Sequence, residues 1–154
     1  MADETCTGRE AEVWCSYQRL QRALGTALDR RLEHGAGISA ADYALLVPLA
    51  TAPGGVLRMR ELGVTVEWDR SRLSHHVSRM VKRGLVVREN CTEDARGANV
   101  RLTEDGRAAI AAAEGHYREA VQRYFFDQAS ADELDLLGRV FRRMLAGLAD
   151  ADRR

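Results

Sequence analysis

The segment from Asp69 to Gly84 constrains the fold of this chain more than any other. Its apolar residues recur at helical spacing and would form one buried face, consisting of Leu73, Val77, Met80 and Val81. Asp69 is a favourable N-cap, and Gly84 is a favourable C-terminal stop. The sequence therefore predicts an amphipathic helix from Asp69 to Arg83.

The opposite face of this helix is basic. It carries Arg72, His75, Arg79 and Lys82, with Ser71 and Ser78 beside them. Between residues 69 and 88 the chain has six basic residues and a single acid, Asp69. A helix that merely faces solvent usually mixes charges of both signs, whereas a face of one sign with short hydroxyl donors suits phosphates and base edges. The pattern favours a nucleic-acid-binding helix over a plain surface helix.

Short β-prone segments follow the helix. Residues 85–88 and 98–102 have the composition of strands, and residues 91–97 between them are polar. Before the helix, residues 58–64 can form a short helix and residues 66–68 can form a turn. Helix, turn, basic helix and hairpin together describe a winged helix-turn-helix. In that arrangement the basic helix enters a major groove about 12 Å wide, and the hairpin reaches the backbone or the adjacent minor groove.

Five short motifs follow one another through this region. They are Glu61-Leu62-Gly63, Trp68-Asp69-Arg70-Ser71-Arg72-Leu73, Met80-Val81-Lys82-Arg83-Gly84-Leu85-Val86, Asp94-Ala95-Arg96 and Leu102-Thr103-Glu104-Asp105-Gly106. Their order and spacing resemble the MarR family of bacterial transcriptional regulators, most densely from Ile38 to Ile110. The resemblance implies a regulator rather than an enzyme, with double-stranded DNA as its partner and no cofactor.

Amphipathic segments flank this head on both sides. The stripe of the first segment consists of Val13, Tyr17, Leu20, Leu24, Ala27 and Leu28. The stripe of the last segment, which a Ser130–Glu133 capping box begins, consists of Leu134, Leu137, Phe141, Met144, Leu145 and Leu148. A second copy of the chain would bury both stripes most economically, although they could instead cap one monomeric core. The resemblance favours a homodimer, which would read a pseudo-palindromic operator.

These patterns predict a mainly α fold with a small β-wing, divided into three regions. Residues 1–37 form an N-terminal dimerisation helix, residues 38–106 a winged helix-turn-helix DNA-binding domain, and residues 107–154 the C-terminal dimerisation helices. A Ser39–Asp42 capping box begins the first helix of the middle region. A chain of 154 residues suits one such protomer.

The charge of the chain is segregated. The whole sequence has 23 basic and 23 acidic residues, but residues 58–101 have ten basic residues and six acids. The three cysteines lack paired spacing, which is typical of reduced thiols. The chain has neither an apolar run of membrane-spanning length nor a signal-peptide pattern at its start, so we expect a cytoplasmic protein without membrane contact.

The residues of the basic helix that we expect to contact DNA fall into two groups. The group in the first turns, where side chains reach base edges, consists of Arg72, Ser74 and His75. The group expected to hold phosphates consists of Ser71, Arg79 and Lys82. Arg72 can fork onto a guanine, which would contribute roughly 1–3 kcal/mol of base discrimination.

Residues next to this helix also receive roles. The resemblance makes Arg96 of the wing-tip motif the candidate for the minor groove, directed by an ion pair with Asp94. Trp68 is expected in the core beneath the helix rather than as a stacking platform, and Arg70 in a structural ion pair. Two residues depart from the family pattern: His76 stands where an apolar residue is usual, and Glu67 where a turn glycine is common.

The resemblance also implies control by a small molecule. Members of the family typically respond to aromatic or phenolic anions held between the reading head and the dimer helices. In this chain such a site would draw on Trp14, Tyr17, Tyr43 and His76, each of which is also a candidate core residue. The expected function is thus a repressor that its effector releases from DNA.

Three other functions fit parts of the sequence. A redox sensor would use Cys15, which lies near the reactive cysteine of one branch of the family. A metal site could draw on His75, His76, Cys91 and Cys6, but the spacing of metal-binding motifs is missing. A protein-interaction module would present the basic helix to an acidic partner. No motif for catalysis is apparent in the sequence.

Overall fold

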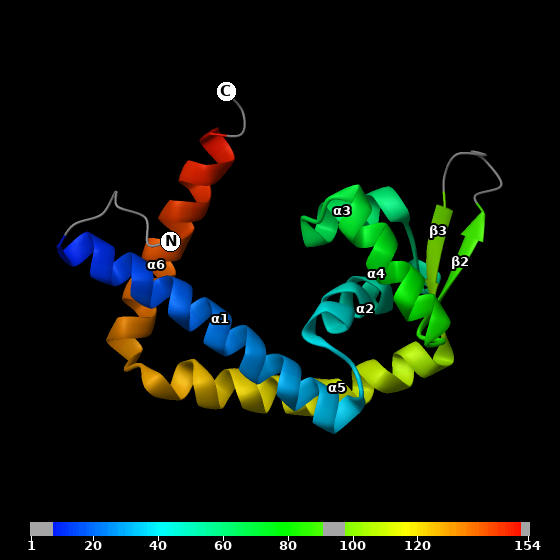
Figure 1. Cartoon of the computed structure of the whole chain (residues 1–154), viewed down its shortest axis with the longest axis horizontal. Coiled ribbons are helices and arrows are strands. Elements are labelled where there is room, and N and C mark those ends of the chain that lie inside the picture. The colour runs from blue at the N-terminus through cyan, green and yellow to red at the C-terminus, as the bar shows by residue number, and fades with distance from the viewer. Residues whose placement is uncertain (1–7, 91–97, 152–154) are drawn as a thin grey trace. The chain divides into compact units, whose positions relative to one another are not determined.

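The structure is a computed structural model that describes residues 8–90 and 98–151 (Figure 1). Its helices are α1 (Arg9–Ala36), α2 (Ala40–Thr51), α3 (Met59–Val66), α4 (Arg70–Lys82), α5 (Glu104–Tyr124) and α6 (Ala131–Ala151). Its strands are β1 (Val56–Arg58), β2 (Val86–Asn90) and β3 (Ala98–Leu102), and single 3₁₀ turns occur at Pro53–Gly55 and Phe126–Gln128. The predicted mainly α fold with a small β-wing is confirmed.

The chain divides into two compact units, one ending at Tyr117 and the other beginning at Arg118. The first unit contains a single apolar core formed by α2, α3, α4, the sheet and the first half of α5. Its fully buried side chains include Leu45, Leu46, Leu49, Leu62, Val77, Met80, Val86 and Val100. This core fixes α4 against the rest of the head. The functional division at residues 37 and 106 stays a prediction.

Both helices that meet at the centre of the head begin at predicted caps. The Ser39–Asp42 capping box is confirmed, because the Asp42 backbone N–H donates to Ser39 Oγ and the Ser39 backbone N–H donates to Asp42 Oδ2. Asp69 caps α4 by accepting the backbone N–H of Arg72 at 2.9 Å. Gly84, with φ at 75°, follows the end of α4 and turns the chain into β2.

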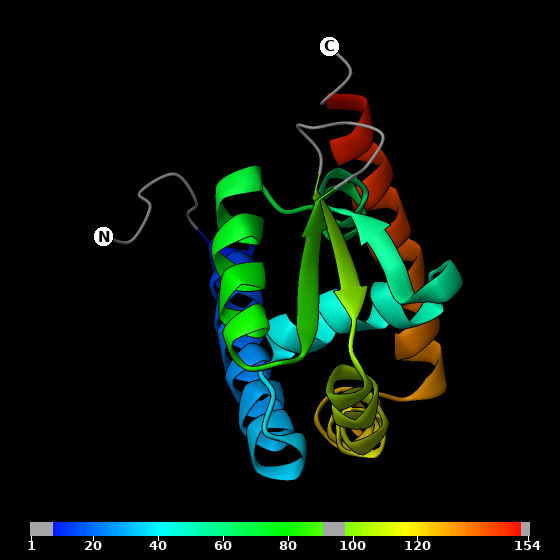
Figure 2. The ribbon, with the colours of Figure 1, turned by 90° about the vertical axis from the view of Figure 1, so that its right-hand side faces the viewer.

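The wing contains one more strand than the sequence predicted. The strand order is β1-β3-β2 and both pairings are antiparallel, with Leu57 opposite Val100 and Arg88 opposite Val100 on the other side (Figure 2). Only the strands now labelled β2 and β3 were expected. β1 has three residues between a Pro-Gly-Gly turn and α3, which is too short for an alternating pattern to be visible in the sequence.

The turn between α3 and α4 contains one residue in the left-handed conformation. Glu67 ends α3 in the left-handed conformation, with φ at 55°, and is the only residue other than glycine with positive φ among those described. Glycine adopts this conformation without strain. Here a glutamate adopts it at a conformational cost.

The Leu102–Gly106 motif joins the sheet to α5. Thr103 Oγ1 donates to the carbonyl oxygens of Gly84 and Leu85 at 2.7 and 2.8 Å and accepts the backbone N–H of Gly106. A Cβ at Gly106 would collide with the Leu85 carbonyl oxygen, so the backbones can approach only because residue 106 is glycine. The glycine that weakens α5 in isolation is needed for its packing.

The second unit comprises the end of α5, the 3₁₀ turn and α6. Ser130 and Glu133 form the predicted capping box at the start of α6, with the Ser130 backbone N–H donating to Glu133 Oε2. The apolar stripe of α6 is largely exposed in the single chain: Phe141 is 41%, Met144 60%, Leu145 65% and Leu148 65% exposed. None of the helices described is long and apolar enough to cross a membrane.

Candidate nucleic-acid interface

α4 has the two faces that its sequence predicts, with one exchange. Leu73, Val77 and Met80 are buried, whereas Val81, expected on the same face, is 38% exposed. His76 takes the fourth buried position with 7% exposure. Residues 76 and 81 lie at opposite edges of the face formed by residues 73, 77 and 80, so helical angle alone does not separate them. Residue 76 is on the edge that meets Asp42 of α2.

The exposed face of α4 is basic. Its exposed side chains are Arg70, Ser71, Arg72, His75, Ser78, Arg79 and Lys82, and Ser74 is half-buried. Ser78 Oγ donates to the Ser74 carbonyl oxygen at 2.8 Å, so its hydroxyl is already used within the helix. The expected ion pair of Arg70 is wrong for the described residues, since its side chain lies exposed without an acidic partner there. The face presents cations and leaves them available to an external anion.

Arg72 lies over the aromatic face of Trp68. The guanidinium carbon is 4.0 Å from the centre of the indole ring, which is the geometry of a cation–π contact. Trp68 itself is half-buried and packs against the apolar core, as expected. It therefore serves as a core residue on one side and as a platform for Arg72 on the other.

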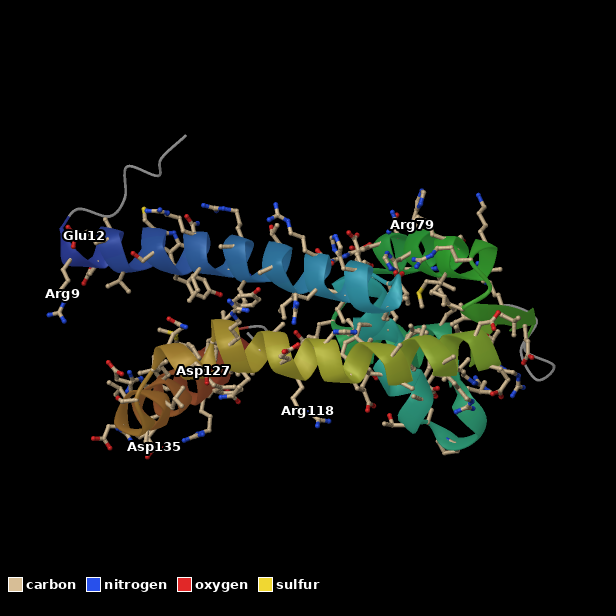
Figure 3. The ribbon with its side chains drawn as sticks, turned by 90° about the horizontal axis from the view of Figure 1, so that it is seen from below. Arg9, Glu12, Arg79, Arg118, Asp127 and Asp135 are labelled. Atoms are coloured by element: carbon tan, nitrogen blue, oxygen red, sulfur yellow. The ribbon has the colours of Figure 1, made fainter. Side chains whose placement is uncertain are left out.

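His76 connects the exposed face of α4 to the interior. Its Nδ1 lies 3.0 Å from Nη2 of Arg79, and its Nε2 lies 2.9 Å from Oδ1 of Asp42. A guanidinium has only donors, so Nδ1 must accept and the ring proton must lie on Nε2, from which it donates to Asp42. The arrangement requires the neutral imidazole in one tautomer. Arg79, on the outer side of α4, is labelled in Figure 3.

Asp42 is the hub of this polar network, which consists of Ser39, Asp42, His76, Arg79 and Arg83. It is 1% exposed, and Arg83 Nη1 donates to its Oδ2 at 2.6 Å. The second terminal nitrogen of Arg83 donates to the Gly37 carbonyl oxygen, also at 2.6 Å. Burial raises the pKa of Asp42, but hydrogen bonds from Ser39 and Arg83 together lower it below its ordinary value. A buried carboxylate thus stays charged because three donors surround it.

The wing strands are held together by a charged pair. Arg101 on β3 makes two hydrogen bonds to Glu89 on β2, from Nε at 2.7 Å and from Nη2 at 3.0 Å. These hydrogen bonds lower the pKa of Glu89. The predicted DNA contacts Asp94 and Arg96 lie outside the described residues.

Of the four residues predicted for an effector site, Trp14 and Tyr17 form a pair, and Tyr43 and His76 have other partners. Trp14 and Tyr17 lie near the start of α1 with ring centres 5.6 Å apart, and both are about half exposed. Tyr43 stacks on Tyr117 of α5 at 4.7 Å, while His76 belongs to the polar network. Cys15 is a free, exposed cysteine on α1. Among the described residues, no group of three or more potential metal ligands occurs.

Asp42 and Arg83 were not among the residues singled out from the sequence. Asp42 was recognised only as part of a capping box, and Arg83 only as part of a basic run. Asp42 is 34 positions from His76 and 41 positions from Arg83 in the chain, so the sequence spacing does not reveal these contacts. The one available signal was His76, a polar residue at an apolar position of an amphipathic helix, which has to find a partner when it is buried.

Comparisons with known proteins agree with the fold. Residues 36–97 match the sequence profile of the MarR family. Sco3205 of Streptomyces coelicolor, a MarR family transcriptional regulator solved in complex with DNA, is 37% identical, with a TM-score of 0.85, over 95% of this chain and 92% of the other. AbsC of the same organism, also a MarR family regulator, is 30% identical with a TM-score of 0.85, over 96% and 99%. The uncharacterized HTH-type transcriptional regulator YdgJ of Bacillus subtilis (strain 168) is 29% identical over 88% of this chain and 78% of its own length.

Proposed function

The chain belongs to the MarR family of transcriptional regulators, and from this premise we propose that it binds operator DNA sequence-specifically, with α4 as its recognition helix. The observation that supports the proposal is the exposed basic face of α4, from Arg72 to Lys82, set on an apolar face that the core holds fixed. A helix of this kind fits the major groove. Its cations would displace counterions from the phosphates.

The proposed contacts divide by position on α4. Near the N-terminus, the residues proposed to contact base edges are Arg72, Ser74 and His75. Along the flank and towards the C-terminus, the residues proposed to bind phosphates are Ser71, Arg79 and Lys82. Asp94 and Arg96 are proposed contacts of the wing with the minor groove, from the sequence motif alone.

We further propose that the functional form is a homodimer. The apolar stripe of α6 and the exposed Val13, Tyr17 and Leu20 of α1 are costly to leave in water, and a second copy would cover them. A two-fold pair presents two copies of α4 about one helical turn of DNA apart, near 34 Å, so the operator would be a pseudo-palindrome.

The sense of regulation proposed here is repression relieved by a small aromatic or phenolic effector. The support is the family and the exposed aromatic pair Trp14 and Tyr17, with Tyr43 and His76 as further candidates. The alternative of a thiol switch has its own support, because Cys15 is exposed and therefore accessible to an oxidant. Release of bound DNA by phenolic carboxylates would support the first. Release by peroxide that a Cys15→Ser variant resists would support the second.

Selection of duplexes from a random pool tests the proposal as a whole. The expected result is enrichment of a pseudo-palindromic sequence whose affinity falls steeply with salt. A protein-interaction module with a basic helix would bind an acidic partner and show no preference among duplexes. Failure to bind any duplex at low salt would refute the proposed function.

A further inference from the structure

Resting on the proposed function, we propose that two residues behind the DNA-facing surface hold its arginines in place before DNA arrives. The pairs are Trp68 with Arg72, and His76 with Arg79. Trp68 and His76 are positioning residues in this proposal, because neither needs to touch DNA. The ligand of the positioned guanidinium groups is duplex DNA.

The geometry gives each arginine a different support. The Arg72 guanidinium carbon lies over the indole ring, 4.0 Å from its centre, and this contact uses none of the five N–H donors of the guanidinium. The Arg79 guanidinium donates one N–H to His76 Nδ1 at 3.0 Å, which leaves its remaining donors for an anion. Both supports therefore restrict the side chain without using up its hydrogen-bonding capacity.

The two supports also contact each other and the interior. The rings of Trp68 and His76 meet edge to face, with centres 5.5 Å apart and planes at 84°. The other nitrogen of His76 donates to Asp42, which is almost fully buried and held by Ser39 and Arg83. The arginines are thus connected to the centre of the head through one continuous set of contacts.

This arrangement matters because a free arginine loses considerable side-chain entropy when it binds. An arginine that is already ordered loses less, so its contact adds more to the affinity. Ordering one such side chain in advance corresponds to about a fivefold gain in affinity. Since the Arg72 fork is directional, ordering it should raise sequence preference as well.

A measurement on the free protein tests the positioning directly. Relaxation of the arginine ¹⁵Nε–H groups should show Arg72 and Arg79 to be more ordered than Arg70, which is exposed on the same helix. A His76→Gln substitution, which keeps a donor near the Nε2 position but loses the Nδ1 acceptor, should make Arg79 as mobile as Arg70. His76→Asn keeps an acceptor near the Nδ1 position and should preserve more of the order. Equal mobility of all three arginines in the unmodified protein would overturn the proposal.

A double-mutant cycle tests whether His76 acts through Arg79. The probe is the duplex recovered by selection, with a scrambled duplex of the same composition as reference. His76→Gln should weaken binding about fivefold in the unmodified chain and leave it unchanged in an Arg79→Ala background. In a Lys82→Ala background, the matched control on the same face, the fivefold loss should persist. An equal loss in all three backgrounds would indicate general destabilisation and overturn the proposal.

The Trp68 pair has its own cycle. Trp68→Phe keeps an aromatic face for Arg72, and Trp68→Leu keeps an apolar side chain without that face. Trp68→Leu should reduce the preference for the selected over the scrambled duplex about fivefold, Trp68→Phe should reduce it less, and neither should change it in an Arg72→Ala background. If the unmodified protein binds no duplex at all, the proposed function fails. If it binds but the effects of the paired substitutions are additive in both cycles, only the proposal that Trp68 and His76 position the arginines is refuted.

Discussion

At the scale of single residues, Asp42 shows how a charge can be stable inside an apolar head. A buried carboxylate without partners would take up a proton, but three donors from α2 and α4 surround this one. The same side chain caps α2 and holds both His76 and Arg83. Removing it would affect the start of one helix and the end of another together.

We predict that Asp42→Asn lowers the free energy of unfolding at neutral pH by about 2–3 kcal/mol, because charged hydrogen bonds in a buried site are lost. The folded-state pKa of Asp42 is lowered, so its contribution is fully present above the unfolded-state pKa of about 3.9 and is lost as the pH falls through the folded-state value. The difference between the two proteins should therefore shrink below pH 4. Urea unfolding across a pH series measures it. Repeating the series in a His76→Gln background shows whether the imidazole contributes, and a difference constant with pH would contradict the assignment.

We predict that Arg72→Ala and Lys82→Ala weaken DNA binding in different ways. In the proposed complex Arg72 contacts a base, so its loss should cost about 1–3 kcal/mol on the selected duplex and much less on a scrambled one. Lys82 is proposed to contact a phosphate, so its loss should weaken both duplexes alike and reduce the slope of affinity against salt by about one. Titrations at several salt concentrations separate the two. Loss of affinity without loss of preference in both variants would show that neither residue reads a base.

Some residues of the candidate site could be predicted from the sequence and others could not, depending on whether their roles rest on local or on long-range contacts. The outward cations of α4 follow from helical periodicity and capping alone, because both are local. The roles of Trp68 and His76 do not, since the first depends on which way Arg72 folds back and the second on Asp42 from another helix. Contacts between distant segments become visible only in three dimensions.

At the scale of elements, α4 could be predicted from local sequence signals, whereas β1 depends on contacts with a distant segment. α4 was predicted with its ends correct to within one residue, because a cap, an apolar stripe and a glycine all agree. β1 was missed because three residues carry no period, and its strand state is decided by pairing with β3. Tertiary pairing thus determines β1, whereas local chemistry is enough to predict α4.

The two glycines of α5 allow a matched test of local propensity against packing. We predict that Gly106→Ala destabilises the head by about 2–4 kcal/mol, because the new Cβ would collide with the Leu85 carbonyl oxygen. Gly115 has nothing within 4 Å of the same position, so Gly115→Ala should stabilise the protein by about 0.8–1 kcal/mol through helix propensity. Thermal or urea unfolding of both variants gives the two signs. A neutral Gly106→Ala would show that α5 can shift away from β2 without cost.

At the scale of the whole molecule, the exposed apolar side chains and the basic helix lie in different parts of the chain. α4, in the middle of the chain, carries four cations and no acid, whereas large exposed apolar side chains gather on α1 and α6, with Trp14 and Leu145 as examples. Monomers rarely expose this much apolar surface. The sequence predicted the stripes on the two terminal helices, but their exposure in a single chain is known only from the structure.

We predict that Leu145→Glu dissociates the proposed homodimer. Leu145 is 65% exposed in the single chain, and a carboxylate in the apolar interface proposed for α6 would lose its hydration without gaining a partner. The head has its own core, so its helix content should remain while sedimentation velocity shows a monomer. A monomer places only one α4 on the DNA, so its affinity for a pseudo-palindromic duplex should fall by a factor on the order of 100 or more, which is the gain that joining two binding sites provides. Its affinity for a half-site should change little. Arg143→Glu, at an exposed position on the opposite side of α6, is the control and should leave the dimer intact. A Leu145→Glu protein that sediments as a dimer would show that α6 does not form the interface, and would leave the apolar face of α1 to explain how the protomers pair.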